Sequence, residues 1–189
     1  MKDGLERGPS SFEIRTVAVI GAGTAGRGFA LACAAADFDV VLEDVMPAKL
    51  RRAEAEYADL GATGRLRLAS TVEDAVREAD VAVDFVPDEL ESKLEIFSMI
   101  DRMAPPKTIL CTPSYALSIT DLASCIYRPE RCVAVRGELV GGGVVRLLHP
   151  AAVAAETLTA LSILLCRLGL DPRCETDPDV PALMKNAAV

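Results

Sequence analysis

Three glycines near the start of the chain have the spacing that a phosphate-binding turn requires. The stretch "VAVIGAGTAGRGFA" places Gly21, Gly23 and Gly26 in the order G-x-G-x-x-G, directly after an apolar run. In such a turn the first glycine permits a tight bend. The second lets a pyrophosphate approach the backbone, and the third lets the following helix pack on the strand. Thr24 and Ala25 complete the turn, where the helix N-terminus offers N–H groups to an anion. We expect these five residues to bind a dinucleotide.

An acidic residue follows at the distance at which dinucleotide-binding domains hold the adenosine ribose. Asp44 ends the next apolar run, close to the spacing of about 20 residues that this contact requires. A carboxylate at this position accepts hydrogen bonds from the ribose and repels the additional phosphate of NADP. The pattern predicts NAD as the cofactor. A glycine-rich structural turn in an unrelated α/β protein is the alternative.

The elements that must position these residues alternate between strands and helices. Apolar runs typical of buried strands predict strands at 16–20, 39–42, 65–69, 81–86, 108–111, 132–135 and 144–148. Helices are expected at 24–36, 47–60, 88–103, 118–124 and 152–168, with a short one capped by Ser70 or Thr71. This order predicts an α/β fold, a Rossmann-like doubly wound and mostly parallel sheet in a single domain. We expect a flexible leader at 1–14, the dinucleotide-binding domain at 15–177 and a tail at 178–189.

The composition argues against several classes of partner. The chain has 28 acidic against 20 basic residues and a formal net charge of −8. Such a surface repels nucleic acids and anionic lipids, so we expect neither a nucleic acid nor a membrane as partner. With one histidine and no C-x-x-C pair, we expect no metal site. The polar N-terminus lacks the apolar core of a signal peptide, which favours a cytoplasmic protein with reduced cysteines.

Several segments together resemble the NAD-binding domain of the 3-hydroxyacyl-CoA dehydrogenase family. They are "VAVIGAGTAGRGFA", "VVLED", "ADVAVDFVPDELESKLEIF", "ILCTPSYALSITDLA", "RPERCVAV" and "ETLTALSILLCRLGLDPRCETD". The resemblance implies a Rossmann-like domain that binds NAD. It also implies that Asp44 holds the adenosine ribose and that Phe85, Asp88 and Lys93 lie near the nicotinamide half.

The catalytic positions depart from this family. The family's Asn-Thr-Ser run falls on Pro113, Ser114 and Tyr115, so the substrate-contacting serine falls on Tyr115 unless a one-residue slip restores Ser114. The family's catalytic histidine falls on Arg136, which cannot accept a proton from an alcohol because arginine stays protonated in proteins. The glutamate that orients this histidine falls near His149. We also expect the family's C-terminal helical domain to be absent.

Each of the altered residues has a functional and a structural interpretation. Tyr115 is a candidate general acid if Arg136 lowers its pKa, or a half-buried strand aromatic. Arg136 is a candidate for binding a carboxylate or phosphate, or forms a surface ion pair with Glu138 or another acidic residue. His149 is a candidate acid–base group, or a polar strand terminus.

Three functions remain open at this point. The first is an NAD-dependent oxidoreductase with a rebuilt catalytic centre, acting on a small or carrier-bound hydroxy or keto acyl compound. The second is a non-catalytic NAD(H)-binding module, and the third is a non-redox enzyme, such as a cyclase or lyase, on the same scaffold. For the first we expect ordinary 3-hydroxyacyl-CoA oxidation to be absent or very slow. We also expect a homodimer, because the helix at 152–168 is apolar on most of its faces.

Overall fold

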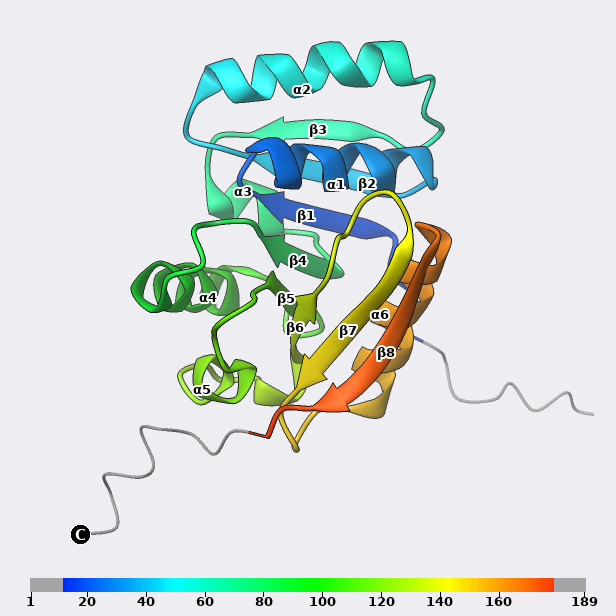
Figure 1. Cartoon of the computed structure of the whole chain (residues 1–189). Coiled ribbons are helices and arrows are strands. Elements are labelled where there is room, and N and C mark those ends of the chain that lie inside the picture. The colour runs from blue at the N-terminus through cyan, green and yellow to red at the C-terminus, as the bar shows by residue number, and fades with distance from the viewer. Residues whose placement is uncertain (1–11, 179–189) are drawn as a thin grey trace, which may run out of the picture.

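The computed structural model describes residues 12–178, and its centre is an eight-stranded sheet (Figure 1). The strands are β1 (Thr16–Ile20), β2 (Asp39–Glu43), β3 (Leu66–Ala69), β4 (Val81–Asp84), β5 (Ile109–Pro113), β6 (Cys132–Arg136), β7 (Gly143–His149) and β8 (Leu170–Thr176). Their order in the sheet is β3-β2-β1-β4-β5-β6-β7-β8. The chain order reverses between β1 and β4, and a crevice at such a switch point is where doubly wound sheets bind ligands. The predicted fold class is confirmed.

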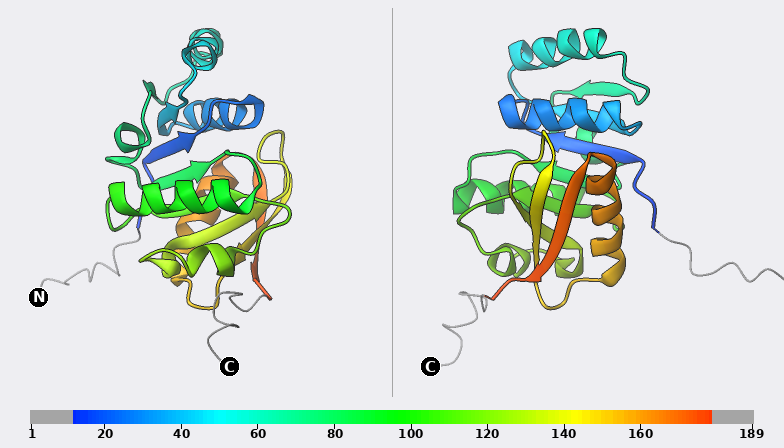
Figure 2. Two further views of the ribbon diagram at one scale, coloured as in Figure 1. Left: turned by 90° about the vertical axis from the view of Figure 1, so that its left-hand side faces the viewer. Right: turned by 45° about the vertical axis from the view of Figure 1, so that its right-hand side comes forward.

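Helices cover both faces of this sheet (Figures 1 and 2). They are α1 (Thr24–Ala35), α2 (Pro47–Leu60), α3 (Val72–Val76), α4 (Leu90–Met103), α5 (Ile119–Ala123) and α6 (Ala155–Arg167), with a 3₁₀ turn at Pro129–Arg131. On one face, α1 and α6 contribute Phe29 and Leu161 to the core. On the other face, α3, α4 and α5 contribute Val76, Phe97 and Leu122. The two cores fix the loops at the strand ends.

Local sequence signals set the helix ends. Pro47 opens α2, where a missing N–H costs nothing, and Gly61 ends it with a left-handed conformation (φ 62°). The Thr71 side chain accepts a hydrogen bond from Asp74 N at the start of α3. The Ser118 side chain accepts one from Asp121 N at the start of α5. These are the caps that the sequence predicts.

The last part of the sheet departs from simple alternation. β7 runs antiparallel to β6, because only a short glycine-rich loop at 137–142 joins them. A parallel neighbour needs a crossover of a dozen residues or more. β8 then pairs with β7 in parallel after the crossover through α6. Helices α4 and α6 begin at Leu90 and Ala155, slightly later than predicted.

The expected leader and tail lie largely outside the described residues, which exclude 1–11 and 179–189. Within the described part, Ile14 is buried in the core and Phe12 packs against it. The packed region therefore begins before residue 15. None of the helices formed by residues 12–178 is long and apolar enough to cross a membrane.

Candidate functional site

A cleft of about 710 Å³ opens at the carboxyl ends of β1, β2 and β4, at the switch point of the sheet. Its floor includes Ile20, Gly21 and Gly23 from the glycine turn. The other walls come from the segments after β2 and β4 and from α3 and α4, and are lined by Glu43, Asp44, Val45, Lys49, Val72, Phe85, Val86, Pro87, Ser92, Glu95, Ile96 and Met99. Its lining comes from several elements, and its volume lies in the range of small-molecule and cofactor sites.

The glycine turn has the geometry that the sequence predicts. Gly21 adopts φ 99°, which other residues rarely adopt. A Cβ on Gly26 would lie 2.0 Å from Gly21 O, so only glycine lets α1 approach the strand end. A Cβ on Gly23 would meet no atom of the described chain within 4 Å. The space next to Gly23 is therefore free for a ligand, and the exposed Thr24 and Ala25 begin α1 beside it.

Asp44 is held at the mouth of this turn by three donors. Its Oδ2 accepts hydrogen bonds from Ala22 N at 2.9 Å and Lys49 Nζ at 3.1 Å, and its Oδ1 accepts one from Met46 N at 2.8 Å. Burial pulls the pKa of Asp44 upward, but the hydrogen bonds from Met46, Ala22 and Lys49 outweigh it and hold the pKa below its ordinary value. The side chain is therefore an ionised acceptor at neutral pH, beside the glycine turn.

Phe85 and Lys93 follow β4 but play different structural roles. Phe85 N donates to Ile20 O at 2.7 Å, and its ring packs against Phe29. Phe85 also lines the cleft. Lys93 is only 1% exposed, and its Nζ donates to Asp84 Oδ1 at 2.8 Å and to Pro113 O at 3.1 Å. Lys93 thus joins α4 to the ends of β4 and β5 rather than reaching into the cleft.

Asp88 joins the β4–α4 loop to the loop after β5. Its Oδ2 accepts a hydrogen bond from Tyr115 N at 2.9 Å. Burial pulls the pKa of Asp88 upward, but hydrogen bonds from Ser114 and Tyr115 hold the pKa below its ordinary value. Ser114 is buried, and its Oγ accepts a hydrogen bond from Leu117 N at 3.0 Å. Its hydroxyl is therefore engaged within the loop.

Tyr115 and Arg136 lie at the carboxyl ends of the neighbouring strands β5 and β6. Tyr115 is 68% exposed, and its hydroxyl lies 3.5 Å from Gly137 O. An Arg136 terminal nitrogen donates to Leu117 O at 3.4 Å. Within the described chain, the buried Nε of Arg136 has no hydrogen-bond partner. Its guanidinium forms no ion pair with Glu138 or any other carboxylate of residues 12–178.

The structure does not bring His149 to the other altered positions. Because β7 is antiparallel to β6, and Leu148 pairs with Ala134, His149 lies beside the amino-terminal part of β6. Arg136 stands at the opposite end of that strand, about 10 Å further along at 3.3 Å per residue. The ring Nδ1 of His149 is 3.0 Å from Pro150 O. The candidate acid–base role of His149 beside Arg136 therefore finds no support in this register.

Three charged residues of this region were not singled out in the sequence. Asp84 is a charge in the otherwise apolar run "VAVDF", and a buried charge requires a partner, so this signal was available. Glu43 lines the cleft next to Asp44. The sequence alone does not show the contact of Lys49 with Asp44. That contact depends on the direction in which α2 leaves the end of β2.

The residues of the cleft fit NAD on structural grounds. The open space at Gly23 and the free helix N-terminus of α1 suit a pyrophosphate, and the ionised Asp44 beside them suits a ribose. The fold and this site together define a dinucleotide-binding domain of the Rossmann class.

Comparison with known sequences identifies the family within that class. Residues 16–136 match the family described as "3-hydroxyacyl-CoA dehydrogenase, NAD binding domain". The chain belongs to this family, and NAD is its cofactor.

Individual relatives agree with this assignment. The chain is 32% identical over 137 residues to a probable 3-hydroxybutyryl-CoA dehydrogenase of Bacillus subtilis, covering 64% of this chain and 47% of that protein. It is 29% identical over 188 residues to the 5-formyl-3-hydroxy-2-methylpyridine 4-carboxylate 5-dehydrogenase of Mesorhizobium japonicum, covering 92% of this chain and 60% of that protein. The chain thus spans about half the length of these relatives.

A solved structure shows the same fold. The 3-hydroxybutyryl-CoA dehydrogenase of Escherichia coli K12 superposes with a TM-score of 0.77 at 28% sequence identity. The alignment covers 87% of this chain and 39% of that one. The Rossmann-like arrangement is therefore that of a dehydrogenase NAD-binding domain.

Proposed function

We propose that this chain is an NAD-dependent oxidoreductase whose catalytic centre differs from that of ordinary 3-hydroxyacyl-CoA dehydrogenases. Its substrate is a small or carrier-bound hydroxy or keto acyl compound that carries an anionic group. The domain that performs this reaction comprises residues 15–177 together with Phe12 and Ile14, which pack with its core. When bound, NAD supplies the hydride acceptor or donor.

One observation supports the proposal above all others. Arg136 ends β6, where the family places its general base, and its buried Nε has no partner within the described chain. A guanidinium with free donors suits a carboxylate or phosphate in a planar, paired contact. Arg136 therefore binds and orients the substrate anion. It does not act as the proton acceptor, because arginine remains protonated.

Tyr115 is the group in this proposal that exchanges a proton with the substrate oxygen. Its exposed side chain lies at the same strand ends as Arg136, and its hydroxyl is near Gly137. Asp88 fixes the Tyr115 backbone through its hydrogen bond to Tyr115 N. Ser114 positions the loop, and His149 has no role in the reaction. The name of the Mesorhizobium relative supports an anionic substrate without coenzyme A, because its substrate is a pyridine 4-carboxylate.

The second candidate function is a non-catalytic NAD(H)-binding module. It is favoured by the engagement of Ser114 Oγ with Leu117 N and by the absence of a histidine at position 136. In that case the cleft binds the cofactor and no substrate is turned over.

A substrate panel separates the two functions. NADH absorbance is followed with 3-keto compounds offered as free acids, as methyl esters and as CoA thioesters. The oxidoreductase proposal expects turnover of an acid substrate, with KM raised on the order of tenfold or more in Arg136→Met and the NADH Kd unchanged. NADH binding without turnover of any compound supports the module instead.

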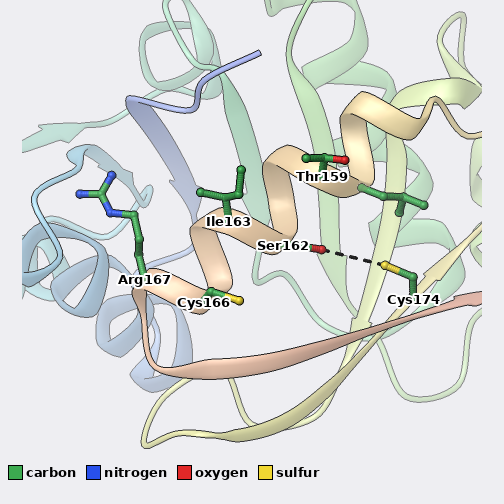
Figure 3. A pocket seen from close by; sticks show the side chains of 7 residues that line it. Thr159, Ser162, Ile163, Cys166, Arg167 and Cys174 are labelled. Carbon is green, nitrogen blue, oxygen red and sulfur yellow. Dashed lines mark hydrogen bonds between the residues drawn. The ribbon is translucent and has the colours of Figure 1, made fainter. Parts of the chain in front are cut away.

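We also propose that the chain forms a homodimer through the outer face of α6 and β8. Ile163 is 54% exposed there, beside a shallow hollow of about 600 Å³ (Figure 3). The other lining residues are Leu158, Thr159, Ser162, Cys166, Arg167 and Cys174. Light scattering tests the dimer: a mass near 20.0 kDa at micromolar concentration contradicts it, whereas Ile163→Glu should convert a dimer into that monomer.

The proposed location is the cytoplasm. All six cysteines, which fall within the described residues, are free thiols. This state is typical of a reducing compartment. Of the possible partners, the proposal keeps only the acyl substrate and the second copy of the chain.

A further inference from the structure

Glu43 places a second carboxylate in the cofactor cleft, next to Asp44. It is the last residue of β2, it is only 5% exposed, and it lines the cleft. Its backbone carbonyl accepts a hydrogen bond from Gly21 N at 2.8 Å. The main chain of Glu43 is therefore tied to the glycine turn, which fixes where its side chain starts.

The surroundings of the Glu43 side chain are mostly apolar. In the sheet register, Glu43 stands between Ile20 of β1 and Ala69 of β3. It shares its face of the sheet with Val41, which packs in the same core as Val72 of α3. Burial raises the pKa of Glu43, and the charge of Asp44 adds to this effect.

Within the described chain, no donor forms a hydrogen bond with this carboxylate. The nearby Lys49 directs its hydrogen bond to Asp44 instead, at 3.1 Å. A carboxylate on a mostly buried residue is stabilised when it accepts a hydrogen bond from a ligand that displaces water. Because the side chain faces the cleft, a ligand in the cleft is the natural source of that donor.

The position of Glu43 indicates which part of the ligand it meets. Asp44 is the ribose acceptor of the proposed function, and a base attached to that ribose enters the neighbouring part of the cleft. The apolar lining residues of the cleft include Val72, Ile96 and Met99, which suit a flat aromatic ring. Among the polar atoms of adenine, the 6-amino group is a donor, whereas the ring nitrogens accept.

We propose that the Glu43 carboxylate accepts a hydrogen bond from the 6-amino group of adenine and thereby selects adenine dinucleotides. The inference rests on the assignment of this cleft to NAD. In a hypoxanthine dinucleotide the amino group is replaced by a carbonyl oxygen. That oxygen offers no proton and repels the carboxylate. The proton that hypoxanthine gains lies on ring N1 instead, away from the position of the amino group, so the site binds this base less tightly.

Calorimetry with NAD+ and nicotinamide hypoxanthine dinucleotide tests this role. The wild-type chain should bind NAD+ more tightly by on the order of tenfold, the value of one hydrogen bond to a charged group. Glu43→Met keeps the side-chain volume and removes the acceptor, so its two Kd values should agree within about twofold. Glu43→Gln can donate to the carbonyl oxygen and should also lose the preference for NAD+.

The control is Glu54→Met on the exposed surface of α2, which should keep the wild-type ratio. Thermal unfolding of Glu43→Met verifies that the variant is folded. If Glu43→Met keeps the tenfold ratio, or the wild-type chain binds both dinucleotides equally, the role of Glu43 is overturned while NAD binding stands. If the wild-type chain binds neither dinucleotide, the cofactor assignment fails as well.

Discussion

Three donors fix the carboxylate of Asp44, which preorganises it for the ribose contact that we propose. Replacing it with alanine leaves ribose hydroxyls poorly paired, which costs about 1–3 kcal/mol of binding free energy. We therefore expect Asp44→Ala to weaken NAD binding by that amount and to reduce the preference for NAD over NADP. Calorimetry with both nucleotides measures this.

The matched control is Lys49→Met, which removes a half-exposed donor to Asp44 but keeps the carboxylate. It should change NAD affinity less than Asp44→Ala does. Unchanged NAD affinity in Asp44→Ala would contradict the ribose role.

For single residues, the sequence predicts a role where the local backbone conformation alone dictates the residue type. Gly21 and Gly26 are recognisable because the turn excludes a side chain at those positions, whatever the rest of the fold does. The partnership of Asp84 with Lys93 and the placement of Glu43 in the cleft depend on which elements pack together. His149 was misplaced for the same reason: its position depends on the direction of β7.

The turn between β1 and α1 offers a matched pair of glycine substitutions. Gly26→Ala would bring a Cβ within 2.0 Å of Gly21 O, so the helix must shift. We expect it to lower the free energy of unfolding by about 1–3 kcal/mol, as overpacking does, and to abolish NAD binding.

Gly23→Ala meets no described atom within 4 Å, and its φ of −62° suits alanine. Its stability should stay within about 0.5 kcal/mol of the wild type, whereas NAD binding weakens because the Cβ occupies the pyrophosphate seat. Denaturant unfolding and calorimetry measure the two effects separately. If both variants behave alike in both assays, it is wrong that Gly26 serves helix packing and Gly23 serves the approach of the ligand.

Asp80 joins the amino-terminal ends of β1, β4 and β5, at the edge of the sheet opposite the cleft. It accepts hydrogen bonds from Arg15 N at 2.9 Å, Thr16 N at 3.0 Å and Lys107 Nζ. Burial pulls the pKa of Asp80 upward, but the hydrogen bonds from Lys107, Thr16 and Arg15 hold the pKa below its ordinary value of 3.8. A depressed pKa in the folded state stabilises the fold above pH 3.8, and this contribution is lost as the pH falls through the folded value.

We therefore expect Asp80→Asn to lower the free energy of unfolding by about 1–3 kcal/mol at neutral pH. The difference from the wild type should shrink as the pH falls below 3.8. Asp39→Asn, which breaks an exposed pair with Arg65, is the control and should have little effect. Urea unfolding across this pH range checks the result; a difference that does not depend on pH would contradict the assigned ionisation.

At the scale of the whole molecule, the fold was predictable because most strands and most helices carry their own apolar pattern and end signals. β8 is the exception, because only Leu170 of its seven residues is buried and it has no apolar run. The parallel core from β1 to β6 follows from strict alternation of strand and helix. The reversal at β7 follows from the short loop at 137–142, which cannot hold a crossover. That length was visible in the sequence, but its consequence for His149 required the register.

The proposed function combines the NAD cleft with Arg136 at the position where the family resemblance implies a general base. Removing a positioned base costs about 10²–10⁴-fold in rate, and enzymes typically turn over at about 10 s⁻¹. The most direct test is the steady-state oxidation of NADH by the purified chain with acetoacetyl-CoA. The account predicts turnover at or below about 0.1 s⁻¹ by a protein that binds NADH. Turnover on the order of 10 s⁻¹ would contradict it, because Arg136 would then not stand in the position of the base.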